Sequence, residues 1–92
     1  MNNGLILLPW VRYRSYSYFE RHNLIGHKIA QVWRINGKHW NAMINGQFFR
    51  VDGDILMATS ANEIMEYVDS ELVSVGAKLL TAEQAEKLSL LL

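Results

Sequence analysis

The chain has 92 residues, half of them hydrophobic and 20% charged, with no net charge and no cysteine. This length predicts a single domain over residues 1–92. The absence of cysteine excludes thiolate metal sites, thiol nucleophiles and a disulfide framework, and it favours a reducing, cytoplasmic compartment. No apolar stretch approaches the ~20 residues that a membrane span needs, so we expect no membrane association.

Residues 10–25 fit two local structures. Residues 10–19 can form a strand, but the segment from Ser17 to Leu24 also fits a helix that ends before Gly26. We expect a short N-terminal helix over about residues 15–25.

Three segments with strand-like composition follow, at residues 28–35, 38–44 and 47–51. Asn36-Gly37 and Asn45-Gly46 separate them, and Asn-Gly favours a two-residue hairpin turn because both positions accept positive φ. The pattern predicts a three-stranded antiparallel meander. Asp52-Gly53 is a third turn signal, so residues 54–58 are a candidate fourth strand.

Turns centred on residues 36–37 and 45–46 fix the pairing of these strands. Trp33 then faces Trp40, and Ile44 faces Gln47. One side of the sheet collects mostly apolar residues and should be the core face: Ile29, Trp33, Ile35, Trp40, Ala42, Ile44, Phe49 and Val51. The other side collects a mixed set: Ala30, Val32, Arg34, His39, Asn41, Met43, Phe48 and Arg50.

Two capping-box patterns, Ser60-Ala-Asn-Glu63 and Thr81-Ala-Glu-Gln84, predict helix starts. Apolar residues recur at three- and four-residue spacing after each of them. We therefore predict an α+β fold in which one face of the meander packs against two C-terminal helices.

The charges are divided between the two halves of the chain. Residues 1–51 hold seven arginines and lysines against Glu20 alone, a net charge of +6. Residues 52–92 hold two lysines against eight acidic residues, a net charge of −6. One interpretation is a basic face for an anionic partner. The other is that the two halves neutralise each other within the fold.

The sequence holds no recognisable catalytic or metal-binding set. The three histidines lack a metal-ligand spacing. Asp52, Asp54 and Glu63 fit part of a calcium-loop pattern, but Leu56 and Met57 stand where that loop needs an oxygen ligand and a glycine. We expect no metal, no cofactor and no enzymatic activity.

A basic, aromatic surface remains as the candidate for function. Arginine pairs with phosphate or carboxylate through a rigid fork, and aromatic side chains add contact area, so the surface suits a nucleic acid or a protein partner. The aromatic residues of the first quarter could instead complete the core. The candidate partner-binding residues are Arg34, His39, Asn41, Met43, Phe48 and Arg50, with Arg12 and Arg14 at the edge.

The run Gly37-Lys38-His39-Trp40-Asn41-Ala42-Met43-Ile44, followed by residues 59–67, resembles ethylene-response-factor-type DNA-binding domains and the related integrase arm-binding domains. Those domains read the major groove with a three-stranded sheet backed by one helix. The resemblance covers about residues 28–72 and implies groove contacts by Arg34, Asn41 and Arg50. His39, inserted before Trp40, and the acidity of the helix depart from the pattern.

The chain also resembles, by type, the small accessory proteins of bacteriophages, including anti-CRISPR inhibitors. It shares their short length, tight hairpins, acidic helices and lack of a catalytic set. This resemblance implies a phage-encoded stoichiometric inhibitor that docks on a host protein or nucleoprotein complex, with or without direct nucleic-acid contact. The split charge ranks it first, ahead of a DNA-binding module of a mobile element. The end at Leu88 to Leu92 could pack inside or form a dimer contact.

Overall fold

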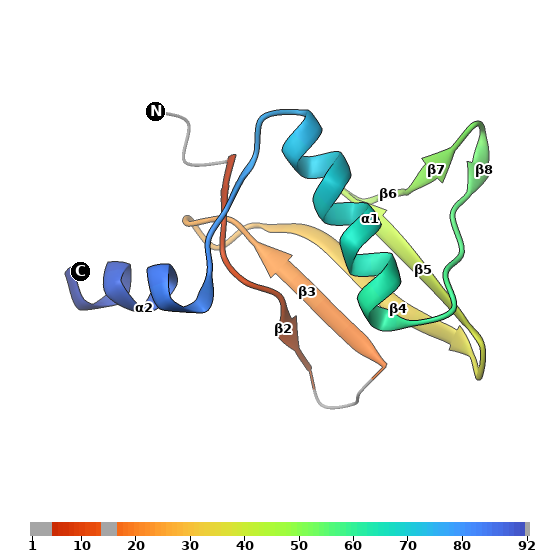
Figure 1. Cartoon of the computed structure of the whole chain (residues 1–92), viewed down its shortest axis with the longest axis horizontal. Coiled ribbons are helices and arrows are strands. Elements are labelled where there is room, and N and C mark those ends of the chain that lie inside the picture. Colours follow the sequence, from red (N-terminus) through yellow and green to blue (C-terminus); the bar gives the residue numbers. More distant parts are fainter. Residues whose placement is uncertain (1–4, 14–16, 92) are drawn as a thin grey trace.

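The fold is α+β, as the sequence predicts, in a computed structural model that describes residues 5–13 and 17–91 (Figure 1). Five strands form an antiparallel meander in the order β2-β3-β4-β5-β6, and two short pairs, β1–β9 and β7–β8, lie outside it. The strands are β1 (Ile6–Leu7), β2 (Val11–Arg12), β3 (Tyr18–His22), β4 (Lys28–Asn36), β5 (His39–Ile44), β6 (Gln47–Phe48), β7 (Arg50–Val51), β8 (Asp54–Ile55) and β9 (Lys78–Leu79). The helices are α1 (Ala61–Ser74) and α2 (Ala82–Leu91).

The expected N-terminal helix over residues 15–25 is wrong, because residues 18–22 form β3. This strand pairs with β4, so that Tyr18 lies opposite Trp33 and Arg21 lies opposite Ala30. Pairing with a long neighbouring strand outweighs the local helix signal, which is a weak determinant when tertiary contacts compete with it. Gly26, with φ of 88°, lies in the β3–β4 connection and does not end a helix.

The two Asn-Gly hairpins behave differently. Asn45 and Gly46 have positive φ, and Ile44 pairs with Gln47, as predicted. At the first hairpin, by contrast, Asn36 pairs with His39 across Gly37 and Lys38. The Lys38 amide donates to the Asn36 side-chain oxygen at 2.9 Å. Asn36 therefore supports the turn with its side chain, and its backbone does not adopt positive φ.

A one-residue bulge at Ile35 changes the faces of the sheet. Moving the turn by one position alone would preserve every face, because the pairing then shifts by two residues. The bulge between Arg34 and Asn36 then shifts the pairing back by one residue, so that Arg34 lies opposite Trp40 and Trp33 lies opposite Asn41. The prediction that Trp33 shares the face of Trp40 is therefore wrong. Trp40 is buried in the core, at 7% exposure, and Trp33 lies on the opposite face.

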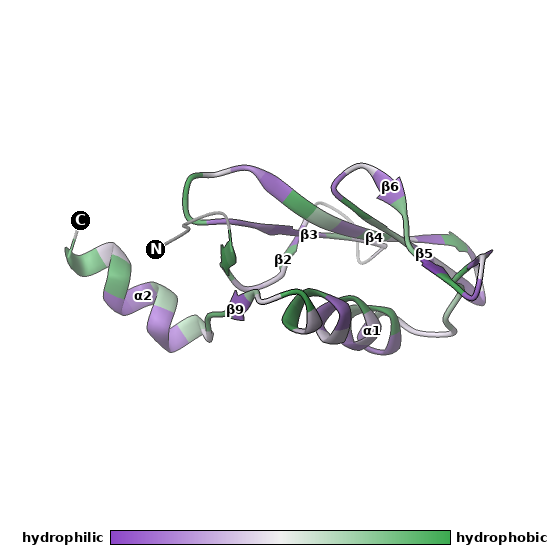
Figure 2. Ribbon diagram, turned by 90° about the horizontal axis from the view of Figure 1, so that it is seen from above, coloured by the Kyte–Doolittle hydropathy of each residue, from purple (hydrophilic) through white to green (hydrophobic). Residues whose placement is uncertain are grey.

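The core lies between the sheet and α1, which packs on β4 and β5 (Figure 2). The predicted apolar stripe of α1 is confirmed, with Ile64, Val68 and Leu72 buried. The side chain of Ser60 caps the helix by accepting from the Glu63 amide at 3.1 Å. The sheet contributes small residues beneath the helix, which allow its close approach. The buried hydrophobic cluster comprises Leu7, Ala30, Val32, Trp40, Ala42, Ala58, Ile64, Val68 and Leu72.

The second helix, α2, lies on the same side of the sheet as α1 but beyond the end of the sheet (Figures 1 and 2). The capping box predicted at its start is present, because the Thr81 and Gln84 side chains each accept from the other's amide, at 3.1 and 2.9 Å. None of the described residues of α2 is buried. Neither described helix has the length and apolar character to cross a membrane.

An ion pair joins the sheet to α1, and its arginine is buried while the side chain of its aspartate is 28% exposed. Arg21 is only 4% exposed, and its Nε lies 3.3 Å from Asp69 Oδ1. The same oxygen accepts from Trp10 Nε1 at 3.0 Å, and Arg21 Nη1 donates to the Leu8 carbonyl at 2.8 Å. Burial lowers the pKa of Arg21 and raises the pKa of Asp69, although each partner opposes the shift of the other. The pair thus cancels one charge from each half of the chain.

Replacing each tryptophan in turn tests the face assignment. We expect Trp40→Ala to lower the free energy of unfolding by about 3–5 kcal/mol, because it empties a core position. We expect Trp33→Ala to cost only about 1 kcal/mol, because that side chain lies outside the core. Urea unfolding followed by circular dichroism measures both losses. Equal losses at the two positions would contradict the assignment.

The ion pair of Arg21 and Asp69 can be tested with single and double variants. Asp69→Ala leaves the Arg21 guanidinium buried without its counterion, and we expect it to cost about 3–5 kcal/mol of unfolding free energy. Arg21→Met combined with Asp69→Leu removes both charges and should recover most of that loss. Urea unfolding of the two single variants and the double variant measures the coupling. A double variant no more stable than Asp69→Ala would refute this account.

Candidate functional site

The face of the sheet opposite α1 is the candidate functional site, because no described element covers it (Figure 2). Residues directly opposite each other on paired strands share a face, so the register identifies its members. We call this surface the open face, and it comprises Val11, Tyr18, Glu20, Gln31, Trp33, Asn41, Met43 and Phe48.

One half of the open face is apolar. The rings of Trp33 and Phe48 pack with their centroids 5.8 Å apart, and Met43 lies directly opposite Phe48 on the neighbouring strand. Phe48 is 40% exposed, and Trp33 and Met43 are half-buried. We call these three residues the apolar patch. Two strand pairings place them, β4 with β5 and β5 with β6, so the patch is supported by the sheet and not by a loop.

The other half of the open face is a polar network around Glu20. The Tyr18 hydroxyl lies 2.5 Å from Glu20 Oε2 and 2.6 Å from Gln31 Oε1. His22 Nε2 lies 3.2 Å from Glu20 Oε1, and Lys28 Nζ donates to Gln31 Oε1 at 2.8 Å. The Gln31 amide nitrogen reaches the Met43 sulfur at 3.2 Å, which links the network to the apolar patch.

The phenol of Tyr18 is held in its neutral form by this network. A phenol has one proton, so it donates to one oxygen at a time, and the carboxylate is the stronger acceptor. Burial, followed by the hydrogen bond and the charge of Glu20, raises the pKa of Tyr18 to about 12 from an ordinary value of 10.0.

The side chain of Asn41, on the open face, has one polar atom without a hydrogen-bond partner. Its Oδ1 is shielded from solvent and has no hydrogen-bond partner among the described residues. An unsatisfied polar atom of this kind costs about 1–3 kcal/mol. The side chain stands opposite Trp33, at the border of the apolar patch.

Four of the eight predicted partner-binding residues lie together on the helix-free side of the sheet. Asn41, Met43 and Phe48 belong to the open face, and His39 lies at its end, with Nδ1 3.2 Å from Asn36 Oδ1. His39 alternates with Trp40 along β5 and therefore points away from α1.

The predicted arginines that the structure describes do not lie on the open face. Arg34 lies opposite Trp40, and Arg12 lies opposite Phe19, so both stand on the side of α1. Arg50 is in the separate β7–β8 hairpin, where it donates to the Gly53 carbonyl at 3.0 Å. Arg14 falls outside the described residues. The prediction that Arg34, Asn41 and Arg50 share one face is therefore wrong, because the Ile35 bulge and the end of β6 separate them.

Sequence reasoning missed half of the open face. Trp33 was expected in the core, and Tyr18 and Glu20 were expected in a helix. The alternation of Tyr18 and Glu20 with the inward-facing Phe19 and Arg21 is a strand pattern that could have found β3. No sequence signal marks the bulge at Ile35, which reassigns Trp33.

The described residues contain no group of three or more histidine, aspartate or glutamate side chains placed to hold a metal ion. Comparison of the chain with protein-family models, with curated proteins and with solved structures finds no match.

The polar network predicts that one tyrosine titrates at a higher pH than an ordinary tyrosine. The raised pKa of Tyr18 stabilises the fold at pH values below 10, and that contribution is lost as the pH rises toward 12. Titration followed by tyrosinate absorbance should therefore show a late step for one of the four tyrosines. Tyr18→Phe should remove this step, whereas Tyr67→Phe, at an exposed site on α1, should retain it. Persistence of the step in Tyr18→Phe would rule out the assignment.

Proposed function

We propose that this chain is a non-catalytic binding protein whose open face docks on a protein partner. The observation that carries the proposal is the apolar patch of Trp33, Met43 and Phe48 on a sheet face that no described element covers. Aromatic residues and methionine are enriched in protein interfaces, and a rigid aromatic pair is a typical hot spot.

The charges of the open face favour a protein partner over a nucleic acid. Binding to a phosphate backbone is driven by clustered lysines and arginines. The open face carries the carboxylate of Glu20 with a single lysine, Lys28, 3.9 Å from it. The arginines Arg34, Arg12 and Arg50 stand elsewhere. A surface with an apolar centre and a polar flank matches the anatomy of a protein interface, in which the apolar core supplies the affinity and the polar rim supplies specificity.

The polar network supplies that flank. The hydrogen bonds described above hold its side chains in place, namely those of Tyr18, Glu20, Gln31 and Lys28. Little side-chain entropy is therefore lost when a partner binds. The unsatisfied Asn41 oxygen, beside Trp33, is an acceptor that a donor of the partner would satisfy after a small rotation of the side chain.

Such a domain acts by covering a surface of its partner, without catalysing a reaction. The resemblance to phage accessory proteins implies a more specific form of this function. In that form the chain is a stoichiometric inhibitor in the host cytoplasm, and it covers a surface of a host protein or nucleoprotein complex. The support for this form is the resemblance of type together with the preformed docking surface.

Capture from a bacterial lysate with matched variants tests the proposal. The wild-type chain, immobilised, should retain a stoichiometric partner. Phe48→Ser with Trp33→Ser should lose it, because the apolar patch is gone. Arg34→Glu with Arg50→Glu is the control and should retain the partner, because those side chains lie off the open face. Circular dichroism verifies that each variant is folded.

The reverse pattern, with capture lost in the arginine variant and kept in the patch variant, would refute the docking surface. A salt titration with random duplex DNA distinguishes the alternative. We expect no binding to bare DNA. Binding that weakens steeply as salt rises would show a DNA-binding module instead.

A further inference from the structure

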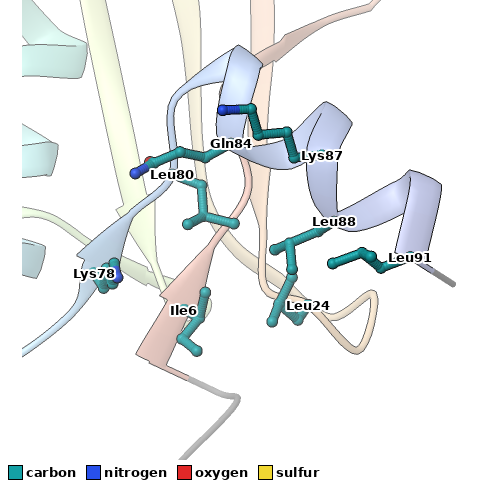
Figure 3. Close-up of a pocket in the computed structure, with 8 residues that line it drawn as sticks. All are labelled: Ile6, Leu24, Lys78, Leu80, Gln84, Lys87, Leu88 and Leu91. Carbon is teal, nitrogen blue, oxygen red and sulfur yellow. The ribbon is translucent and has the colours of Figure 1, made fainter.

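A second apolar surface lies outside the open face, between α2 and β1. It is a groove of about 440 Å³ (Figure 3). Its apolar walls come from β1, the β3–β4 connection, the end of β9 and α2, through Ile6, Leu24, Leu80, Leu88 and Leu91. Its polar lining consists of Lys78, Gln84 and Lys87, and Figure 3 shows their ends away from Leu24 and Leu91. No carboxylate of the described residues lines the groove.

The same helix carries an exposed apolar projection. This projection is Leu90, which is 80% exposed. Leu91, at the rim of the groove, is 82% exposed, and no other large hydrophobic residue that the structure describes is as exposed as these two. Glu86 lies one helical turn before Leu90, on the same outward side of α2, because residues four apart are neighbours on a helix. The projection is therefore a leucine with an acidic neighbour.

The projection and the groove are complementary in shape and charge. The groove is apolar inside and basic at its margin, and the projection is apolar with a carboxylate one turn away. Lys78 makes no ion pair with any described residue. Lys87 has only an exposed contact of 3.5 Å with Glu83, which contributes little. The groove's charge is thus available to an acidic group.

We propose that two copies of this chain form a two-fold symmetric dimer in which Leu90 of each α2 fills the groove of the other copy. A two-fold rotation makes the contact reciprocal, so both grooves are filled at once and the contact closes without further growth. Glu86 of each copy then lies beside Lys78 of the other. The dimer covers leucines that are otherwise open to water and leaves the open face free.

Sedimentation velocity over a range of protein concentrations tests this dimer. The wild-type chain should pass from monomer to dimer as concentration rises. Leu90→Glu should raise the dissociation constant by about tenfold or more, because it places a charge in the apolar groove. Met57→Glu, at a residue that is 57% exposed and distant from α2 in the sequence, is the matched control and should leave the constant unchanged. Circular dichroism verifies the fold of each variant.

A charge exchange tests the orientation of the two copies. Lys78→Glu and Glu86→Lys should each weaken the dimer, and the double variant should restore it. A chain that stays monomeric at every concentration would overturn the proposal, as would a dimer that Leu90→Glu does not weaken. Phe48→Ser should leave the dimer intact, so failure of the dimer and failure of the open face as a docking surface can be distinguished.

Discussion

The organisation of the molecule depends on the bulge at Ile35. It places Trp40 rather than Trp33 beneath α1. Without it, Trp33 would lie on the same face as Trp40, and both indoles would lie under the helix. With it, Ala30, Val32 and Ala42 lie there and the helix can pack closely. The composition of both faces of the sheet therefore follows from one extra residue in β4.

The second organising feature is the ion pair of Arg21 and Asp69. The chain divides its charges into a basic half and an acidic half, and this division could indicate a partner or internal compensation. The structure shows compensation at one central point, where an arginine of β3 meets an aspartate of α1. Trp10 joins the same oxygen, so the pair also holds the N-terminal segment against the helix. Burial opposes both charges, so the pair depends on all of its partners remaining in place.

Sequence reasoning identified the elements that depend on local patterns. The apolar stripe of α1, the Ser60 and Thr81 caps and the Asn45-Gly46 turn are all fixed by residues within a few positions of each other. Sequence reasoning failed where a contact between residues distant in the sequence determines the local structure. Residues 18–22 become a strand because β4 pairs with them. Asn36 supports its turn with its side chain, and the bulge at Ile35 moves Trp33 to the face away from α1. Three of the predicted site residues lie on the open face: Asn41, Met43 and Phe48. The predicted positions of Arg34 and Arg50 depended on the strand register, and the observed register places both arginines off this face.

The open face and the α2 groove are two independent surfaces, and the assignment of the first depends entirely on the pairing of β4 with β5. Backbone nuclear Overhauser effects across these strands measure that pairing directly in solution. We expect Val32 to pair with Ala42 and Trp33 with Asn41, with Ile35 unpaired. Contacts that pair Trp33 with Trp40 would contradict it, because both indoles would then lie in the core and the apolar patch would not exist.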